Sequence, residues 1–327
     1  MKMRDIILKA GDWGRRAALA AIILFAGTNR GWANGGYFVT YNSEVEKGEL
    51  ELMLMNDFTS PSAARGEREG FGQYWSHMLE LEYGVSDRYA TEFMVESFED
   101  PVKHRAVFTG YRWENRYRLF KERVPLNPMV YAEYENLDPR TRYKMEVSGW
   151  IKPPYKEKEG ESGRERILET RFIFSDKAGP LDIAFNWINE SDLVSGETAF
   201  GYSLGLMWMM QPENDQRTAE APGAAYTCPM HHDVHEAKPG VCPHCGMSLV
   251  SSGPSSESRH GVGLGLELYG GLGDTRSFGL SPSRQEHYFG PIFMYHINSR
   301  WMAHVQLANG LSHASDNLVR FNIGYEF

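Results

Sequence analysis

Three cysteines and one histidine, close together in the last third of the chain, are the residues best suited to chemistry. Cys228 and His231 have two residues between them, and so have Cys242 and Cys245. Such a spacing forms a tight turn that directs both side chains of a pair at one point. Three thiolates and an imidazole make a four-coordinate set that suits zinc, and thiolates with thioethers suit Cu(I). With the two flanking methionines, the predicted metal ligands are Cys228, Met230, His231, Cys242, Cys245 and Met247.

The segment around these residues resembles a family of small heavy-metal-binding domains with the pattern Y-x-C-P-M-H…P-G-x-C-P-x-C-G-M-x-L. The family occurs in periplasmic adaptors of copper and silver efflux systems and at the N-termini of some copper-transporting P-type ATPases. The resemblance implies one Cu(I) or Zn(II) ion per chain, with Ag(I) as a further candidate, and periplasmic efflux components as partners. His232 departs from the family, which usually has proline there, and adds a further potential ligand. The matching positions are Tyr226, Cys228, Pro229, Met230, His231, Pro239, Gly240, Cys242, Pro243, Cys245, Gly246, Met247 and Leu249.

A disulfide between Cys242 and Cys245 is the alternative interpretation, because a chain exported from the cytoplasm enters an oxidising compartment. It would leave Cys228 as a single thiol. It also gives no reason for the methionines, the histidine and the glycine that match the family pattern. We therefore favour the metal site, and we expect His235 and His244 to lie outside its ligand shell.

A serine and a histidine near the C-terminus offer a second kind of chemistry. His313 and Ser315 precede the last predicted strand, and outer-membrane lipid hydrolases place a serine and a histidine at a barrel edge. Nucleophilic catalysis also needs a third group that orients the histidine, and the sequence shows none beside this pair. It has no glycine-rich phosphate loop and no nucleophile elbow. No catalytic residue is therefore predicted, and the chain is not expected to be an enzyme.

The predicted metal site lies in an insert that is bounded by two linkers. Residues 211–225 (QPENDQRTAEAPGAA) and 251–259 (SSGPSSESR) are polar and small. They enclose a module at 226–250, whose 25 residues are too few to bury a core of their own. We therefore expect metal binding to fold the module.

On both sides of the insert, apolar and polar residues alternate with period two. Leu204, Leu206 and Trp208 fall on one face of an extended chain, with Ser203 and Gly205 on the other. Strict alternation indicates strands with one apolar and one polar face, and segments near ten residues match a tilted strand that crosses a bilayer. We therefore predict an all-β fold, an antiparallel transmembrane β-barrel with its apolar face toward lipid. A soluble periplasmic β-protein is the alternative.

The alternating segments number thirteen, whereas single-chain bacterial barrels usually have an even number of strands. We predict twelve strands, with ten to fourteen open, because either one segment is not a separate strand or residues 36–42 add one. The barrel is built from residues 34–210 and 260–327. The segments are 49–56, 73–84, 88–97, 106–119, 128–136, 142–150, 167–176, 180–190, 197–210, 260–270, 286–296, 299–309 and 316–327.

The end of the chain carries the most specific barrel signal. Val319, Phe321, Ile323 and Tyr325 alternate with polar residues, and the chain ends on Phe327. This resembles the closing strand of bacterial outer-membrane barrels, which typically ends in an aromatic residue. The resemblance implies the bacterial outer membrane as the location and its lipid as a partner. Aromatic residues near strand ends are expected to form an interfacial girdle, made of Tyr83, Trp150, Trp208, Tyr269, Tyr288 and Trp301.

Residues 1–33 have the three parts of a cleavable signal peptide. Five Lys and Arg residues precede an apolar core at 17–27, and Gly31 and Ala33 supply small residues before the cleavage site. No apolar run of 18 residues follows, which excludes a multi-helix membrane protein. The net charge of −9 argues against a nucleic-acid partner bound through a basic face.

Two sets of residues on the polar faces point into the predicted lumen. One set is charged, and it forms either a salt-bridge network that fills the interior or a conduit for small ions. The other set is methionine, which either fills gaps or lines a path for Cu(I). The charged set is Glu80, Glu82, Glu92, Glu96, Arg112, Glu114, Arg116, Arg118, Glu133 and Glu135, and the methionines are Met53, Met55, Met78, Met94, Met207 and Met209.

Strand counting places the insert on one side of the membrane. Both termini are expected in the periplasm, and counting back from Phe327 puts the insert on that side. Counting forward from residue 49 gives the opposite side, because of the odd strand. We therefore expect an outer-membrane barrel whose periplasmic module captures a soft or borderline metal in metal handling or tolerance. A passive or substrate-specific pore with a structural metal site is the first alternative, and a lipid hydrolase is the second.

Overall fold

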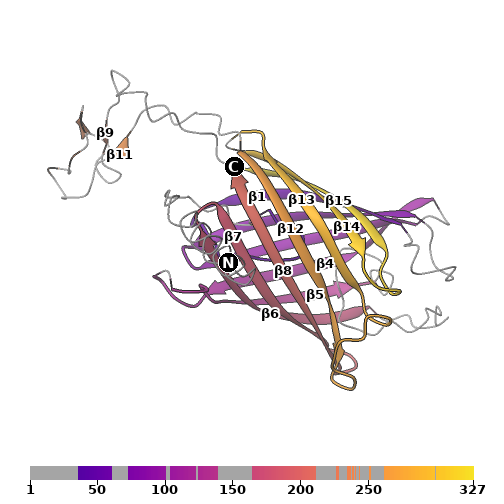
Figure 1. The fold of residues 1–327 in the computed structure, drawn as a ribbon. Helices are drawn as coiled ribbons and strands as arrows, with labels where there is room; N and C mark the ends of the chain where they lie inside the picture. The colour runs from indigo at the N-terminus through magenta and orange to yellow at the C-terminus, as the bar shows by residue number, and fades with distance from the viewer. Residues whose placement is uncertain are drawn as a thin grey trace, which may run out of the picture.

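Twelve antiparallel strands form one sheet that closes on itself as a barrel (Figure 1). The computed structural model describes residues 36–60, 73–100, 104–122, 124–138, 164–210, 261–298 and 300–327, and within the insert residues 226–227, 234–236, 238, 240, 243 and 250–251. The predicted all-β barrel of twelve strands is confirmed. Its strands are β1 (Leu50–Ser60), β2 (Tyr74–Ser86), β3 (Tyr89–Asp100), β4 (Arg105–Arg118), β5 (Met129–Leu137), β6 (Glu165–Ala178), β7 (Leu181–Asp192), β8 (Thr198–Met210), β12 (Gly261–Asp274), β13 (His287–His296), β14 (Trp301–Gly310) and β15 (Asn317–Glu326).

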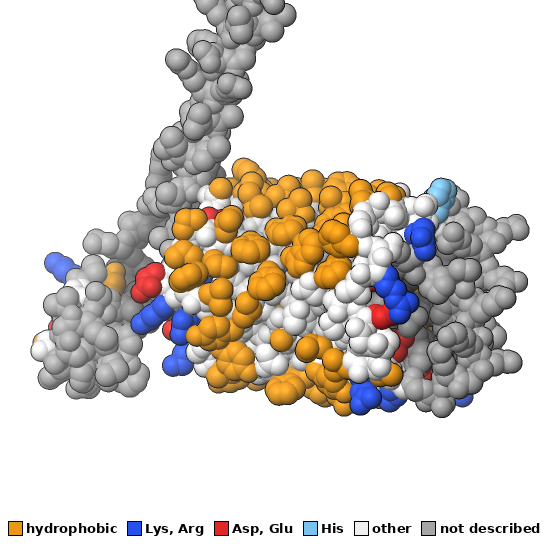
Figure 2. All heavy atoms as spheres, turned by 90° about the horizontal axis from the view of Figure 1, so that it is seen from below, with side chains coloured by type: hydrophobic (Ala, Val, Ile, Leu, Met, Phe, Trp, Pro, Cys, Tyr) orange, Lys and Arg blue, Asp and Glu red, His pale blue; other side chains and the backbone are white. Residues whose placement is uncertain are grey.

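Successive side chains of a barrel strand point to opposite sides of the wall, because the side-chain period of a strand is two. In β13, Ile292 and Met294 are buried inside the barrel, whereas Phe293 and Tyr295 are exposed on the outside. Figure 2 shows the result on one face: hydrophobic side chains cover the middle of the barrel, and charged side chains gather at its ends. A soluble sandwich would bury this apolar face between two sheets. Among the described residues, no helix has the length and hydropathy needed to cross a membrane.

The first and last strands close the barrel. β1 pairs with β15 from Glu51 opposite Glu326 to Ser60 opposite Asn317. The amide nitrogen of Phe327 then donates to the carbonyl oxygen of Leu50 at 3.0 Å. The alternating C-terminal segment is therefore the closing strand, as its sequence predicts.

The two edges of the barrel differ in their connections. At the edge that carries Leu50 and Phe327, the connections β2–β3 and β6–β7 are each two residues long. At the opposite edge, the connection β5–β6 spans residues 138–164. The insert leaves from the edge with the short turns, because Met210 at the end of β8 pairs with Val262 at the start of β12. Counting strands back from the C-terminus therefore places the insert at the correct edge of the barrel, and counting forward from residue 49 places it at the incorrect one.

Two segments account for the uncertain strand count. Residues 142–150 lie outside the described residues, and the barrel closes without them because β5 pairs directly with β6. Residues 36–42 do not add a strand to the wall. They lie inside the barrel, where their amides bond to lumenal side chains rather than to a neighbouring strand. The predicted signal peptide and linkers also lie outside the described residues, except that Ser251 belongs to a short strand of the insert.

The predicted aromatic girdle is only partly right. Tyr83, Trp208 and Trp301 are exposed on the outside of the barrel, and Trp150 lies outside the described residues. Tyr269 and Tyr288 are buried in the lumen, where their rings stack with centroids 5.2 Å apart. The period of two explains the error, because Tyr269 directly follows the outward-facing Leu268 and therefore points inward.

Candidate functional site

The insert has a small sheet of its own. β9 (Tyr226–Thr227) lies between β10 (His235–Glu236) and β11 (Val250–Ser251). Thr227 is opposite both His235 and Val250. The sheet therefore brings the beginning and the end of the predicted module side by side, at the residue that precedes Cys228.

All six predicted metal ligands lie outside the described residues: Cys228, Met230, His231, Cys242, Cys245 and Met247. The first three are in the segment that joins β9 to β10, and the other three are in the segment that joins β10 to β11. The pairing of the three strands ties the ends of both donor-bearing segments together. Three thiolates with an imidazole and two thioethers are the donor chemistry of copper, silver or zinc.

Inside the barrel, Arg116 is the centre of one network of charges. Its Nε atom lies 2.7 Å from the carboxylate of Glu114, and its Nη2 atom contacts Glu82 and lies 3.7 Å from Glu92. All four side chains are buried. Tyr41, from the segment inside the barrel, places its ring 5.1 Å from the guanidinium and donates to Glu114 at 2.8 Å.

A second network surrounds Arg112. Its guanidinium lies 2.6 Å from Glu96, 3.2 Å from Glu133 and 3.6 Å from Glu135. Removing such charges from water is costly unless each one is paired, and these side chains are buried and paired. The structure therefore favours the interpretation of the charged residues as a network that fills this part of the lumen. Arg118 lies outside it, at the end of β4, where it donates to the carbonyl oxygen of Asp87.

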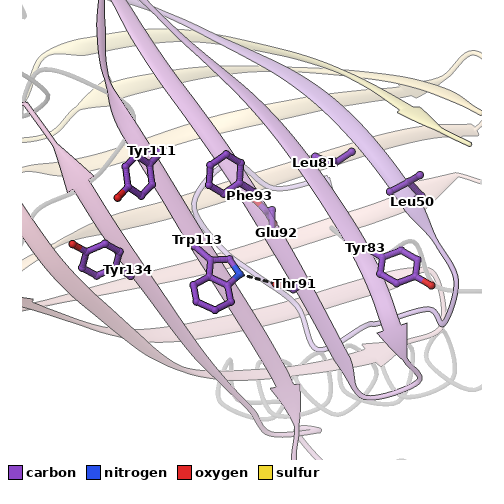
Figure 3. Close-up of a pocket in the computed structure, with 9 residues that line it drawn as sticks. All are labelled: Leu50, Leu81, Tyr83, Thr91, Glu92, Phe93, Tyr111, Trp113 and Tyr134. Atoms are coloured by element: carbon purple, nitrogen blue, oxygen red, sulfur yellow. Dashed lines mark hydrogen bonds between the residues drawn. The ribbon is translucent and has the colours of Figure 1, made fainter.

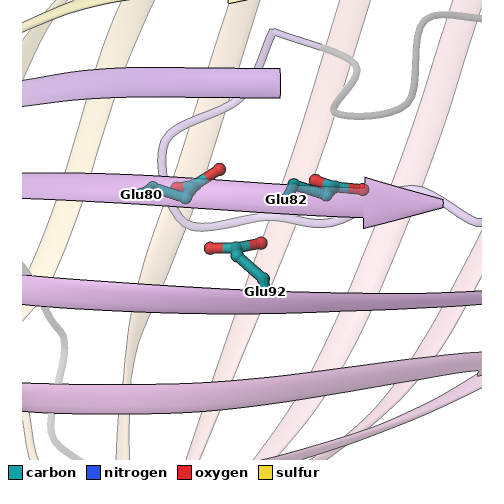
Figure 4. Close-up of side chains that lie close together, drawn as sticks. All are labelled: Glu80, Glu82 and Glu92. Carbon is teal, nitrogen blue, oxygen red and sulfur yellow. The ribbon is translucent and has the colours of Figure 1, made fainter. Parts of the chain in front are cut away.

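Two groups of buried carboxylates have oxygens within 4.8 Å of one another, Glu80 with Glu82 and Glu92, and Glu133 with Glu135 and Glu169. Figure 4 shows the first group, in which the Glu92 carboxylate on β3 turns toward Glu80 and Glu82 on β2. Oxygen donors of this kind suit hard cations such as Ca²⁺ and Mg²⁺. Their chemistry is therefore different from that of the predicted soft-metal module.

Residues 36–43, here called the plug segment, run through the lumen and bond to strands on several sides. The Tyr37 hydroxyl donates to Asp182 at 2.8 Å, and the Tyr41 amide donates to Asn186 at 2.7 Å. The Ser43 amide donates to the hydroxyl of Ser175 at 2.8 Å. The sequence analysis missed this role, because the segment has the length and apolar residues of a short strand.

Glu267 on β12 is the main anchor of the plug segment. Its carboxylate accepts bonds from the amides of Phe38, Val39 and Thr40 at 3.3, 2.8 and 2.6 Å. It also accepts a bond from the Gln306 side chain at 2.7 Å. A fully buried carboxylate is thus satisfied by four donors, three of which belong to the plug segment.

The six methionines predicted to face the lumen do so. Met78 and Met94 are buried against each other with Met55, and Met207 is buried against Tyr37 of the plug segment. The sequence analysis missed Met294 and Met302, which also lie on lumenal positions of their strands. The signal was present, because Met294 alternates with outward-facing aromatic residues in β13.

The serine of the hydrolase hypothesis has a structural role. The Ser315 hydroxyl accepts a bond from the His287 amide at 2.8 Å and donates to the His287 carbonyl oxygen at 2.9 Å. It therefore ties the loop between β14 and β15 to the start of β13. His313, by contrast, is exposed.

A hollow on the outer wall has the character of a lipid-facing surface. It has a volume of about 580 Å³ and is lined mostly by aromatic and leucine side chains of β1 to β5. Figure 3 shows that these side chains lie along neighbouring strands. The indole nitrogen of Trp113 donates to the hydroxyl of Thr91 at 3.0 Å, the bond that is dashed in Figure 3. Such grooves between exposed side chains suit acyl chains better than a polar substrate.

The comparison with known protein families finds a match in the insert. Residues 225–251 match the family model of the heavy metal binding domain. The match spans the insert's small sheet and every predicted ligand, and it confirms the resemblance seen in the sequence. None of the curated proteins matches the chain.

Solved structures similar to this chain are outer-membrane barrels of low sequence identity. An outer membrane channel from Pseudomonas putida F1 is 13% identical with a TM-score of 0.43, covering 87% of this chain and 98% of that one. The KdgM porin is 8% identical with a TM-score of 0.41, covering 85% and 99%. LpxR from Salmonella typhimurium is 8% identical with a TM-score of 0.38, covering 84% and 100%.

Proposed function

We propose that this protein is a bacterial outer-membrane barrel that captures a soft or borderline heavy metal through its inserted module, as part of metal handling or tolerance. The observation that carries the proposal is the heavy-metal-binding-domain match at residues 225–251, between β8 and β12 of a closed barrel. The module would bind Cu(I), Ag(I) or Zn(II) by the thiolates of Cys228, Cys242 and Cys245, with His231 or Met230 completing the shell.

The location in the outer membrane is part of the proposal. It is supported by the apolar outer face, by the absence of free edges in a closed sheet, and by the signal-like residues 1–33. The barrel edge with the short turns also carries both ends of the wall, Leu50 and Phe327. In outer-membrane barrels the short turns face the periplasm. The module, which leaves from this edge, would therefore meet metal ions and periplasmic efflux components.

Anaerobic metal analysis of the refolded mature protein tests the proposal. We expect the module of the wild type to bind about one copper, silver or zinc ion. A Cys242→Ser/Cys245→Ser variant removes one pair of donors and is expected to lose that ion. His235→Gln is the matched control, because His235 lies in β10 of the same sheet but outside the proposed ligand set.

The outcomes separate the candidate functions. A module without bound metal under saturating Cu(I), Ag(I) and Zn(II), with its thiols free, overturns the proposed site. Ion conductance in planar bilayers from such a protein would then point to a pore. Loss of metal in His235→Gln as well as in the cysteine variant would show that the ligand shell is not the one proposed.

A further inference from the structure

Methionine and histidine side chains occupy two adjacent rows of lumenal positions, and each row runs over several neighbouring strands. The strands of the first row lie on both sides of the insert. In the first row, Met209 of β8 is opposite Gly263 of β12, which is opposite Met294 of β13, which is opposite His304 of β14. The second row continues from β12 to β1. Its members, in order of pairing, are Gly261, His296, Met302, Gly324 and Met53.

The glycine at the centre of the first row is where the sulfurs converge. A Cβ atom on Gly263 would lie 3.1 Å from the Sδ atom of Met209 and 3.2 Å from the Sδ atom of Met207. It would also lie 3.1 Å from the methyl carbon of Met294, whose sulfur contacts Gly36 of the plug segment. Glycine at this position therefore leaves room for three thioethers from two strands to meet in the lumen.

His304 presents a free nitrogen in the same region. Its Nδ1 atom lies 3.0 Å from the carbonyl oxygen of Gly36. A carbonyl oxygen only accepts, so Nδ1 carries the proton, and the lone pair of the neutral ring is on Nε2. Nε2 is buried and has no hydrogen-bond partner among the described residues. Metal-bound histidines have this arrangement, in which a backbone carbonyl holds one ring nitrogen and fixes the other as the ligand.

Gap filling accounts for buried methionines elsewhere in this barrel. Met129 packs against the hydrophobic side chains of Tyr131 and Ile173. Packing alone does not account for a buried imidazole whose lone pair is unpaired, because buried polar atoms are nearly always bonded. A soft cation beside the thioethers would satisfy it.

We propose that Met207, Met209, Met294 and the Nε2 atom of His304 form a second metal site, within the lumen, that takes Cu(I) or Ag(I). Thioethers are soft and uncharged, so they select these monovalent ions over Zn(II). The site lies beside the two points where the insert joins the wall, since Met209 is next to the end of β8 and Gly263 is near the start of β12. Its ligands are separate from those of the module, and it stands without the proposed function.

Silver binding to the full mature chain tests this site. In a module-blank variant, all six proposed module ligands are replaced, as Cys228→Ser, Met230→Leu, His231→Gln, Cys242→Ser, Cys245→Ser and Met247→Leu. We expect this variant, desalted after anaerobic loading, to retain about one Ag(I) per chain, with sulfur neighbours by X-ray absorption. Adding Met207→Leu, Met209→Leu and Met294→Leu, which conserve side-chain volume, is expected to weaken binding at least tenfold. His304→Gln keeps a donor for Gly36 but has no imidazole lone pair, and it is expected to weaken binding too.

Met129→Leu in the same background is the control, and it should bind silver as the module-blank variant does. A difference in gel mobility between unheated and heated samples checks that each variant is a folded barrel. Two silver ions in the wild type and one in the module-blank variant support both sites. A folded module-blank variant that retains no silver, while the wild type retains one ion, overturns the lumenal site and leaves the module intact. One ion in both proteins supports the lumenal site and contradicts the proposed module.

Discussion

The carboxylate of Glu267 holds the main chain at Val39 inside the barrel, with the amide nitrogen 2.8 Å from Oε1. The amides of Phe38 and Thr40 bond to the same carboxylate. In a strand these three donors would need partners on a neighbouring strand. One buried side chain replaces those partners and so allows residues 36–43 to cross the lumen as a plug.

Glu267→Leu is expected to release the plug segment. Hydrogen bonds to a charged group contribute about 1.5–3 kcal/mol each, so the loss of three bonds costs several kcal/mol. A change of about 3 kcal/mol shifts a two-state population by roughly a hundredfold. We therefore expect the ion conductance of the variant in planar bilayers to exceed that of the wild type at least tenfold.

Glu135→Gln is the control for this prediction, because it removes a buried lumenal carboxylate of the Arg112 network. It should conduct as the wild type does. A variant without residues 36–43 should conduct at least as well as Glu267→Leu. Equal conductance in all four proteins would show that the plug segment does not block the lumen.

Asp57 and Arg320 join the first and last strands of the barrel. The Nε atom of Arg320 lies 3.0 and 3.1 Å from the two carboxylate oxygens, and both side chains are buried. Removing one partner of a buried pair leaves an unpaired charge, which typically costs 3–5 kcal/mol. We expect Arg320→Met to lower the free energy of unfolding by about 3–5 kcal/mol in urea titrations of vesicle-inserted protein.

The double variant Asp57→Leu/Arg320→Met is expected to recover part of that loss, because it removes the unpaired charge along with its partner. Additive losses in the two single variants would mean that the pair contributes no coupling at the seam.

The wall of the barrel was predictable from the sequence because the alternation is local. Leu264 and Gly265 can be assigned to the outer and inner faces without knowledge of any other strand, and the alternation over residues 319–325 predicts the closing strand in the same way. The plug segment was not predictable in this way. Tyr41 bonds to Asn186, which is 145 residues away, and Val39 bonds to Glu267, which is 228 residues away. Nothing local distinguishes such a segment from a short strand.

The alternation predicts which side chains point into the lumen, but it does not predict which of them contact one another. Alternation placed Glu82 and Arg116 in the lumen, but their contact joins β2 to β4 across an intervening strand. The cluster at Gly263 likewise depends on register, because Met209 and Met294 reach it from opposite neighbours. Only the folded sheet defines which lumenal side chains share a row.

Glu49, just before β1, gives the stability of the barrel a predicted pH dependence. Burial, most of all, and the nearby carboxylates of Glu82, Glu326 and Glu46 together raise the pKa of the Glu49 carboxyl to about 8, while Arg116 opposes the shift. The folded state therefore keeps a proton that the unfolded state gives up near its ordinary value of 4.5. The folded state is favoured in full at low pH, and this contribution is lost as the pH rises from about 4.5 through about 8.

Glu49→Gln imitates the protonated form at every pH. We expect its urea midpoint to match that of the wild type at about pH 4, below the ordinary pKa of the carboxyl, and to exceed it at about pH 9. Glu122→Gln, which changes an exposed carboxylate at the same edge of the barrel, is the control. Its urea midpoint should show no such pH-dependent difference from that of the wild type. A constant difference between Glu49→Gln and the wild type across the pH range would contradict the titration.

The side of the membrane that the module faces can be measured with single cysteines. In a background with Cys228→Ser, Cys242→Ser and Cys245→Ser, Thr275→Cys adds a thiol to the exposed loop between β12 and β13, at the edge opposite the insert. Lys121→Cys adds one to an exposed turn at the insert's own edge.

We expect a membrane-impermeant maleimide to label Thr275→Cys in intact cells, because loops at that edge face outward in the proposed orientation. Lys121→Cys should be labelled only after the outer membrane is permeabilised, and so should the module cysteines of the wild type when no metal is bound. The comparison is internal, because Lys121 and the points where the insert joins the wall lie at one edge of the same closed sheet. Labelling of Lys121→Cys but not of Thr275→Cys in intact cells would reverse the orientation, and would contradict the proposed capture of metal in the periplasm.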